Sequence, residues 1–193
     1  MSIKYSMYQI FLFLSKIYTF FIKNSFQSFG KNSIIKPFLN FSNPQFISIG
    51  QDVNIGNSCR ITVSTGFGNL KTKSTTKTKI KIGDHVDIGN NSFISANNNI
   101  QIGNHVIMAP DVFITDHDHG FLDVSKNLHQ QPLTEGGFVK IEDNVFLGVK
   151  SSILKNVTIG QHSVVGANSV VTKDVPPFCI VAGNPAKIVK KIK

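Results

Sequence analysis

Residues 141–176 read IEDNVFLGVKSSILKNVTIGQHSVVGANSVVTKDVP. An aliphatic residue returns at every sixth position of this stretch: Ile141, Leu147, Ile153, Ile159, Val165 and Val171. A strict period of six matches neither the turn of an α-helix nor the alternation of an ordinary strand. It is typical of a hexapeptide β-helix, in which each hexad forms a short strand and a corner and the aliphatic side chain fills the interior.

Three earlier runs of the same pattern begin at Ile49, Ile82 and Ile102, and each stops after three hexads. Three hexads therefore make one coil of a triangular prism. The predicted coils are 49–66, 82–99, 102–119, 141–158 and 159–176. The interruptions are 67–81, 100–101 and 120–140. All of them then leave from one corner, and insertions in a solenoid collect on its binding face. The sequence predicts an all-β chain with a parallel β-helix over residues 46–176.

The composition narrows the range of partners. The 193 residues carry a formal charge of +9, which favours an anionic partner such as nucleic acid, an acidic membrane surface or a phosphate-rich ligand. No basic motif with interleaved aromatic residues is found, so we expect no nucleic-acid partner. Cys59 and Cys179 lie far apart, so a disulfide framework and a zinc cluster are not expected either. A reducing compartment such as the cytoplasm is the default, and no metal is expected.

The N-terminal part, residues 1–45, is predicted to hold an apolar helix and a lead-in. Its residues 7–26 are mostly apolar, but Lys16 interrupts them and no small-residue cleavage site follows, so neither a membrane span nor a signal peptide is predicted. Two interpretations stay open. The helix packs on the body or on another subunit, or it makes a peripheral contact with the inner membrane surface, with Lys4, Lys16 and Lys23 at lipid headgroups.

Stacking of the coils places the stretch FITDHDHGF, residues 113–121, at a corner. Coils repeat at about 4.8 Å, so equivalent hexad positions form columns along the prism. One such column is Ser64, Asn97, His117, Asn156 and Asp174. His117 is therefore expected directly above Asn97, where the long loop 120–140 leaves, and His119 begins that loop.

This position suits His117 to general-base catalysis, since the neutral imidazole is available near neutral pH. Asp116 or Asp118 could orient the ring, as carboxylates commonly do. The alternative is a surface histidine at a turn with two ordinary turn aspartates. The β-helix context favours the catalytic interpretation, because function concentrates in loops on rigid scaffolds.

The repeats, the stretch TDHDHG (115–120) and the tail VVTKDVPPFCIVAGNPAKIVKK (170–191) resemble the hexapeptide-repeat acyltransferases. Within them, the maltose/galactoside and cell-surface polysaccharide O-acetyltransferases are the most similar. The resemblance covers about residues 30–193. It implies a left-handed β-helix, a homotrimer with active sites in grooves between prisms, acetyl-CoA as donor and a sugar hydroxyl as acceptor. It also implies that residues 177–193 form a CoA-binding tail, for which we expect a short helix.

The resemblance also assigns residues by position. The catalytic base of the family matches His117. The predicted substrate-binding residues are Asn97, Asp116 and His119. The predicted CoA-binding residues are Val149, Ala167, Thr172, Lys173, Lys187 and Lys190. The family often has serine where this chain has Val149, so a contact there would use the backbone.

Direct transfer is the expected mechanism, with no covalent enzyme intermediate, and Cys59 is expected in the core because it occupies the fifth position of its hexad. Two alternatives remain. The γ-class carbonic anhydrases resemble this β-helix and hold zinc with three histidines. Here His85, His105 and His117 do not share a hexad corner, and His85, His105 and His162 are expected as solvated corner residues. A non-catalytic assembly module is the other alternative. The basic loop 67–81 either covers a neighbouring groove or is a solubilising flap.

Overall fold

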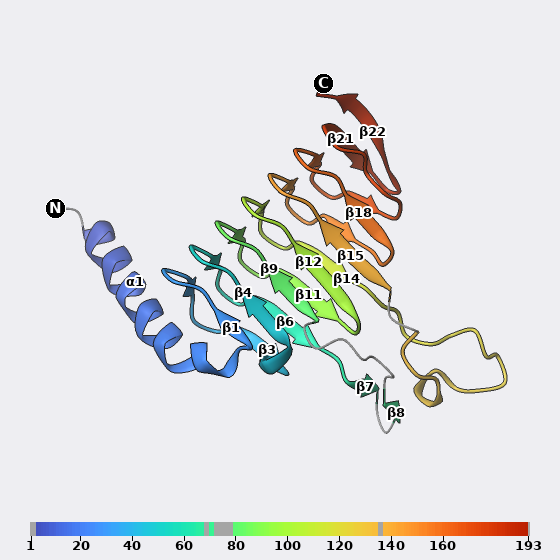
Figure 1. Ribbon diagram of the computed structural model, residues 1–193, viewed down its shortest axis with the longest axis horizontal. Coiled ribbons are helices and arrows are strands. Elements are labelled where there is room, and N and C mark those ends of the chain that lie inside the picture. Colours follow the sequence, from blue (N-terminus) through green and yellow to red (C-terminus); the bar gives the residue numbers. More distant parts are fainter. Residues whose placement is uncertain (1–2, 68–69, 72–78, 135–136, 193) are drawn as a thin grey trace.

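The chain is a left-handed parallel β-helix built from three sheets, whose strands run parallel except for the last strand of one sheet (Figure 1). The computed structural model describes residues 3–67, 70–71, 79–134 and 137–192. Sheet A holds β1 (Ser28–Phe29), β4 (Ile47–Ile49), β9 (Ile80–Ile82), β12 (Asn99–Ile102), β15 (Phe138–Ile141) and β18 (Val157–Ile159). Sheet B holds β2 (Ile34–Ile35), β5 (Asn54–Ile55), β10 (Asp87–Ile88), β13 (Ile107–Met108), β16 (Phe146–Leu147), β19 (Val164–Val165), β21 (Cys179–Gly183) and β22 (Ala186–Lys191). Sheet C holds β3 (Asn40–Ser42), β6 (Arg60–Val63), β11 (Phe93–Ala96), β14 (Phe113–Thr115), β17 (Ser152–Ile153) and β20 (Val170–Val171).

One strand from each sheet makes a coil, and we number the coils from the N-terminal end. They are coil 1 (β1–β3), coil 2 (β4–β6), coil 3 (β9–β11), coil 4 (β12–β14), coil 5 (β15–β17) and coil 6 (β18–β20). The chain turns from A to B, from B to C and from C to A at three corners, which we call the A–B, B–C and C–A corners.

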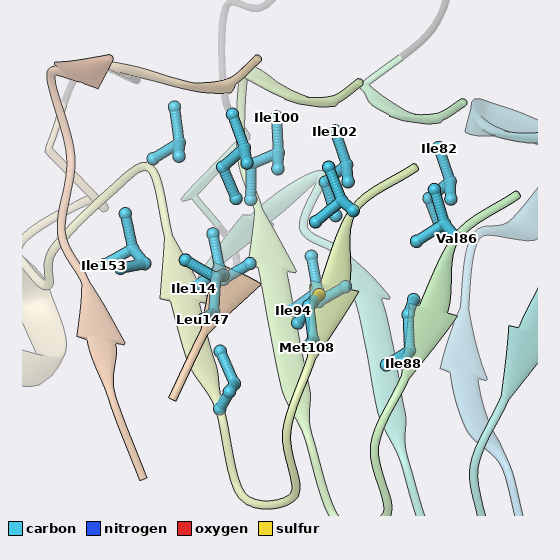
Figure 2. Close-up of a cluster of buried hydrophobic side chains, with 14 of the residues drawn as sticks. Ile82, Val86, Ile88, Ile94, Ile100, Ile102, Met108, Ile114, Leu147 and Ile153 are labelled. Atoms are coloured by element: carbon cyan, nitrogen blue, oxygen red, sulfur yellow. The ribbon is translucent and has the colours of Figure 1, made fainter. Parts of the chain in front are cut away.

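The hexad aliphatic residues form columns inside the prism, as predicted. In sheet A, one column is in register from coil 2 to coil 6: Ile49, Ile82, Ile102, Ile141 and Ile159. All five are at most 2 % exposed, and Figure 2 shows how such side chains stack in the interior. Full burial of an aliphatic side chain contributes about 1.5–3 kcal/mol, so these columns are the main source of stability.

The A–B and B–C corners are tight because one residue in each adopts a left-handed conformation. At the A–B corner His85, His105 and His162 have φ of 56° and are exposed, so the prediction of solvated corner histidines is confirmed. Histidine, asparagine and aspartate accept this conformation more readily than most residues. The rings of His85 and His105 stack with centroids 4.9 Å apart, one coil above the other.

The prism has six coils, one more than the hexads predicted. Coil 1 lies within the segment expected to be a lead-in, and Phe29, Ile35 and Phe41 are in register with the hexad positions of coil 2. These three residues do keep the spacing of six. Phenylalanine at two of the positions, and a break in phase near Pro44, hid the coil from a search for aliphatic residues.

The predicted interruptions all leave the prism at the C–A corner, which confirms that expectation. The expected insertion at 100–101 is wrong in its placement. Ile100 is fully buried in β12 and in register with Ile80, so the two extra residues are Asn97 and Asn98 at the corner itself. Much of the basic loop 67–81, and with it the prediction for that loop, lies outside the described residues. The structure describes only the pairing of β7 (Gly66–Phe67) with β8 (Leu70–Lys71) and the chain from residue 79 onward.

The expectation of a helix in the C-terminal tail is wrong. The tail forms β22, which pairs antiparallel with β21 at the end of sheet B. Gly183, with φ of 103°, and Ala186 close the turn between the two strands. Without β22, the backbone edge of β21 would be unpaired, and the β-branched Ile188 and Val189 favour a strand over a helix at this edge.

Helix α1 (Ile3–Ile22) lies across the N-terminal end of the prism, beside coil 1 (Figure 1). The Oγ1 atom of Thr19 accepts a hydrogen bond from the backbone N–H of Ile35 at 2.8 Å and lies 3.1 Å from its carbonyl oxygen. The prediction that the helix packs on the body is therefore confirmed. Within the ranges that the structure describes, no helix has the length and apolar character needed to cross a membrane.

Candidate active site

His117 lies at the C–A corner of coil 4, directly after β14, where the long loop leaves the prism. Its Nδ1 atom is 2.9 Å from Oδ1 of Asp116 and 3.4 Å from Oγ1 of Thr115. The side chain is 12 % exposed. A neutral ring that donates its Nδ1–H to Asp116 keeps its lone pair on Nε2, on the other side of the ring. That is the tautomer a general base requires.

Asp116 is fully buried and is fixed by the chain segment that joins coil 3 to coil 4. Its carboxylate accepts backbone N–H groups from Asn97, Asn98 and Asn99 at 2.7, 2.8 and 2.7 Å. Hydrogen bonds to a charged acceptor are short and strong, so three of them set the orientation of the carboxylate. The two-residue insertion at Asn97 and Asn98 turns these N–H groups towards Asp116. The buried carboxylate of Asp116 contacts the ring of His117, so it is positioned to orient that ring.

Asn97 lies one coil below His117, since the pairing of Ser95 with Thr115 continues to these two residues. It is 2 % exposed, and its Nδ2 donates to the carbonyl of Thr134 at 3.4 Å. Asn98 donates to the carbonyl of Gly137 at 3.0 Å. The two asparagines thus hold the base of the long loop. Within the described ranges the Oδ1 atom of Asn97 is buried without a hydrogen-bond partner, which is rare for an amide oxygen.

Lys79 is a residue of this corner that the sequence analysis did not single out. It is 5 % exposed, and its Nζ donates to the carbonyl oxygens of Asn97 at 2.8 Å and Ser64 at 3.3 Å. Burial lowers the pKa of Lys79, and the nearby charge of Asp116 acts in the opposite direction. A lysine at the start of a strand in a lysine-rich loop gives no sequence signal for this buried position.

His119 and Asp118 belong to the loop. His119 is exposed and pairs with Leu133 across the loop in an antiparallel bridge. Asp118 Oδ2 is 2.7 Å from the Nζ atom of Lys155, which anchors the loop to coil 5. These contacts place His119 within the loop near the His117 corner, on its solvent side.

The predicted CoA residues occupy two different corners. Val149 and Ala167 are exposed and lie at the B–C corner of neighbouring coils, where Asn168 N–H donates to the carbonyl of Val149 at 2.9 Å. Lys187 in β22 pairs with Ala182, close to the same corner, and Lys190 lies farther along the strand. The stacking of Val149 and Ala167 is therefore confirmed.

The other two predicted CoA residues, Thr172 and Lys173, are exposed at the C–A corner of coil 6, two coils beyond His117. The outer face of sheet C thus separates the two groups in one chain. The hexad spacing predicted which residues stack on one another, but not at which corner of the prism each stack lies.

Comparison with known proteins supports the fold and the repeat. Residues 138–173 match a family model described as bacterial transferase hexapeptide (six repeats). The protein described as putative lipopolysaccharide biosynthesis O-acetyl transferase WbbJ of Escherichia coli is 32 % identical over 154 residues, which are 77 % of this chain and 76 % of WbbJ. The chain belongs to the hexapeptide-repeat acyltransferase family.

Other members of the family extend this result. A probable acetyltransferase of Mycobacterium tuberculosis is 32 % identical over 144 residues, which are 75 % of this chain but only 44 % of that longer protein. A hexapeptide-repeat containing acetyltransferase of Vibrio cholerae, crystallised with acetyl coenzyme A, is 26 % identical with a TM-score of 0.62. That comparison covers 93 % of this chain and 79 % of the Vibrio protein.

Proposed function

We propose that this protein transfers an acetyl group from acetyl-CoA to a hydroxyl group of a sugar, with His117 as general base. The observation that carries the proposal is the His117–Asp116 pair at the corner where the long loop leaves a rigid prism. The kinship with WbbJ supports an O-acetyltransferase of cell-surface polysaccharide synthesis. The proposed location is the cytoplasm, where acetyl-CoA is available and the two free, buried cysteines stay reduced.

The proposed reaction is a direct transfer. Nε2 of His117 takes the proton of the acceptor hydroxyl as its oxygen attacks the thioester carbonyl. A backbone N–H at a coil corner donates to the developing oxyanion. The new carbon–oxygen bond forms, the carbon–sulfur bond breaks, and the imidazolium returns its proton to the leaving thiolate. Asp116 holds the Nδ1–H tautomer through both steps and stabilises the imidazolium between them.

The residues at the B–C corner fit the donor. The exposed column of Val149 and Ala167 offers backbone groups along the prism axis, as an extended pantetheine arm requires. Lys187 and Lys190 would place positive charge near the diphosphate of CoA. Lysine binds phosphate through a single ammonium group and lacks the bidentate guanidinium group of arginine. Thr172 and Lys173 remain proposed contacts near the adenine end.

We further propose that the active protein is a homotrimer. The outer face of sheet A is mostly polar, with Lys81, Gln101 and Lys140 in register, and it carries the exposed Phe138 at the start of β15. The outer faces of the other two sheets carry apolar side chains, including the partly exposed Ile107 and Phe146 on sheet B and Phe113 on sheet C. Two apolar faces per prism suit a cyclic trimer, in which each copy contacts two neighbours. A groove between copies would bring the C–A corner of one chain towards the CoA residues of another.

The experiment that tests the function combines binding with turnover. Isothermal titration should show micromolar binding of acetyl-CoA, and the Lys187→Glu, Lys190→Glu variant should lose it. A matched Lys140→Glu variant, on the polar face of sheet A, should keep it. Thiol release is then followed with a panel of mono- and oligosaccharides. Absence of acetyl-CoA binding, or equal loss in the Lys140 control, would contradict the proposal.

A further inference from the structure

Helix α1 has the opposite polarity to that of an ordinary surface helix. The side chains that face the prism include the small polar Ser15 and Thr19, which are 0 % and 6 % exposed. The outward side carries large apolar side chains with exposed fractions between 41 % and 75 %: Met7, Ile10, Phe13, Leu14, Ile17, Phe20 and Phe21. Seven large apolar side chains exposed on one side of a single helix mark an interaction site, since soluble monomers rarely present such a cluster.

The reason for the inverted polarity lies in the contact with coil 1. The N–H of Ile35 points away from coil 2 and would be unpaired at the end of the stack. The hydroxyl of Thr19 accepts this N–H at 2.8 Å, while that of Ser15 bonds its own helix at the carbonyl of Phe11. Thr19 on the prism-facing side of α1 is therefore needed to cap the β-helix, and the large apolar side chains of the other side are left exposed.

A basic hollow opens beside this apolar side. It has a volume of about 540 Å³ and lies between α1 and the first strands of coil 1. Lys16, Lys23 and Lys31 line it together with Phe20 and Phe29, and no carboxylate is among its lining residues. The chain has no aspartate or glutamate before Asp52. The apolar side of α1 is complementary to the acyl chains of a lipid. The adjacent hollow, whose charged residues are all lysines, is complementary to the lipid phosphate groups.

We propose that α1 docks the protein on a membrane surface that contains anionic phospholipids. The outward apolar residues of α1 insert among the acyl chains at the headgroup boundary, and the hollow with Lys16, Lys23 and Lys31 receives a lipid phosphate. A second copy of the chain is a poorer occupant, because two such faces would bring lysines together without a carboxylate on either side to pair with them.

The docked orientation has a consequence for the active site. The outward side of α1 faces away from coil 1, so the prism stands on the membrane by its N-terminal end. His117 in coil 4 then lies three coil spacings and one helix diameter, about 25 Å, above the lipid surface. A glycan carried by a membrane lipid could reach that height, which links the docking surface to the proposed acceptor. The docking itself does not depend on the proposed function.

Vesicle flotation of the full chain tests the proposal. The protein is mixed with vesicles of phosphatidylglycerol and phosphatidylcholine, or of phosphatidylcholine alone. We expect the wild type to float with the anionic vesicles only, and high salt to weaken the binding. The Phe13→Ser, Phe20→Ser, Phe21→Ser variant should lose at least about tenfold in bound fraction. Replacement of any one lysine of the hollow by glutamine should lower the binding to anionic vesicles about fivefold.

The matched control removes three exposed apolar side chains at the tip of the long loop: Phe121→Ser, Leu122→Ser and Val124→Ser. It should float like the wild type. Equal flotation of the α1 variant, equal binding to both kinds of vesicle, or equal loss in the loop variant would overturn the proposal. The proposal would also be overturned if the wild type bound no vesicles but formed a larger assembly that the α1 variant does not form. Circular dichroism and acetyl-CoA titration of each variant show whether the fold and the donor site are intact.

Discussion

The ring of His117 and the carboxylate of Asp116 are joined at 2.9 Å, and the carboxylate itself accepts the backbone N–H groups of Asn97, Asn98 and Asn99, where coil 3 passes into coil 4. The orientation of the proposed base is thus set by the corner at which two coils of the prism meet. This arrangement separates the structural role of Asp116 from the chemical role proposed for His117, and the two can be measured apart.

Replacement of Asp116 by alanine should destabilise the protein as well as inactivate it. Three backbone N–H groups, one buried and two partly buried, would lose their acceptor, so we expect the free energy of unfolding to fall by about 3 kcal/mol. Urea unfolding measures the loss. His117→Ala leaves those N–H groups paired and should change the stability by less than half as much. Equal losses in the two variants would contradict the role assigned to Asp116.

The buried Lys79 should make stability depend on pH in the alkaline range. Its pKa is lowered by burial in the folded protein, so between that value and the ordinary 10.5 the unfolded chain binds more protons. Lys79 should therefore contribute a rise in the free energy of unfolding with pH through this window, whereas the raised pKa of Cys59 contributes a fall. Lys79→Met removes this contribution, so the stability of the wild type relative to Lys79→Met should rise with pH through the window. Parallel pH curves for the two proteins would show that Lys79 is not buried as described.

Mixed trimers test whether two chains build one site. His117→Ala removes the proposed base, and Ala167→Trp blocks the proposed donor column. If each site takes His117 from one copy and the B–C corner from the next, equal random mixing of the two inactive chains should restore about a quarter of the sites in a cyclic trimer. Activity of the co-expressed, mixed protein gives the answer. No recovery, with mixed trimers verified by mass spectrometry, would place the whole site in one chain.

Cys59 should be neither reactive nor needed for turnover. Burial raises the pKa of its thiol to about 11, and its Sγ contacts the carbonyl of Gly89 at 3.2 Å. A thiol reagent at neutral pH should label it only after unfolding. Cys59→Ala should keep its turnover and lose about 1–2 kcal/mol of stability. Loss of turnover in a folded Cys59→Ala protein would instead indicate a covalent intermediate.

The hexad spacing was sufficient to predict the three sheets, the interior columns and the corner from which the loops leave. It works because one rule, an aliphatic side chain every six residues, is imposed by stacking along the whole prism. The rule failed where the packing changes at the two ends. Coil 1 fills its interior with Phe29 and Phe41 beside α1, and the tail pairs as β22 because the last strand needs a partner.

The candidate site was predictable only in part, for a similar reason. The column of Asn97 and His117 follows from spacing, whereas the buried position of Lys79 depends on how the C–A corner closes in space. The separation of Ala167 from His117 by sheet C likewise follows from the three-dimensional path of the chain. The outward apolar face of α1 depends on Thr19 reaching Ile35, a contact between residues that no local pattern relates.

The most direct test of the central claim is the turnover number of His117→Ala with acetyl-CoA and an accepted sugar. His105→Ala is the control, because His105 is an exposed corner histidine on the same coil. We predict a loss of about 10²–10⁴-fold for His117→Ala, with acetyl-CoA binding and stability retained, and no loss for His105→Ala. Normal turnover of a folded His117→Ala protein would contradict the account.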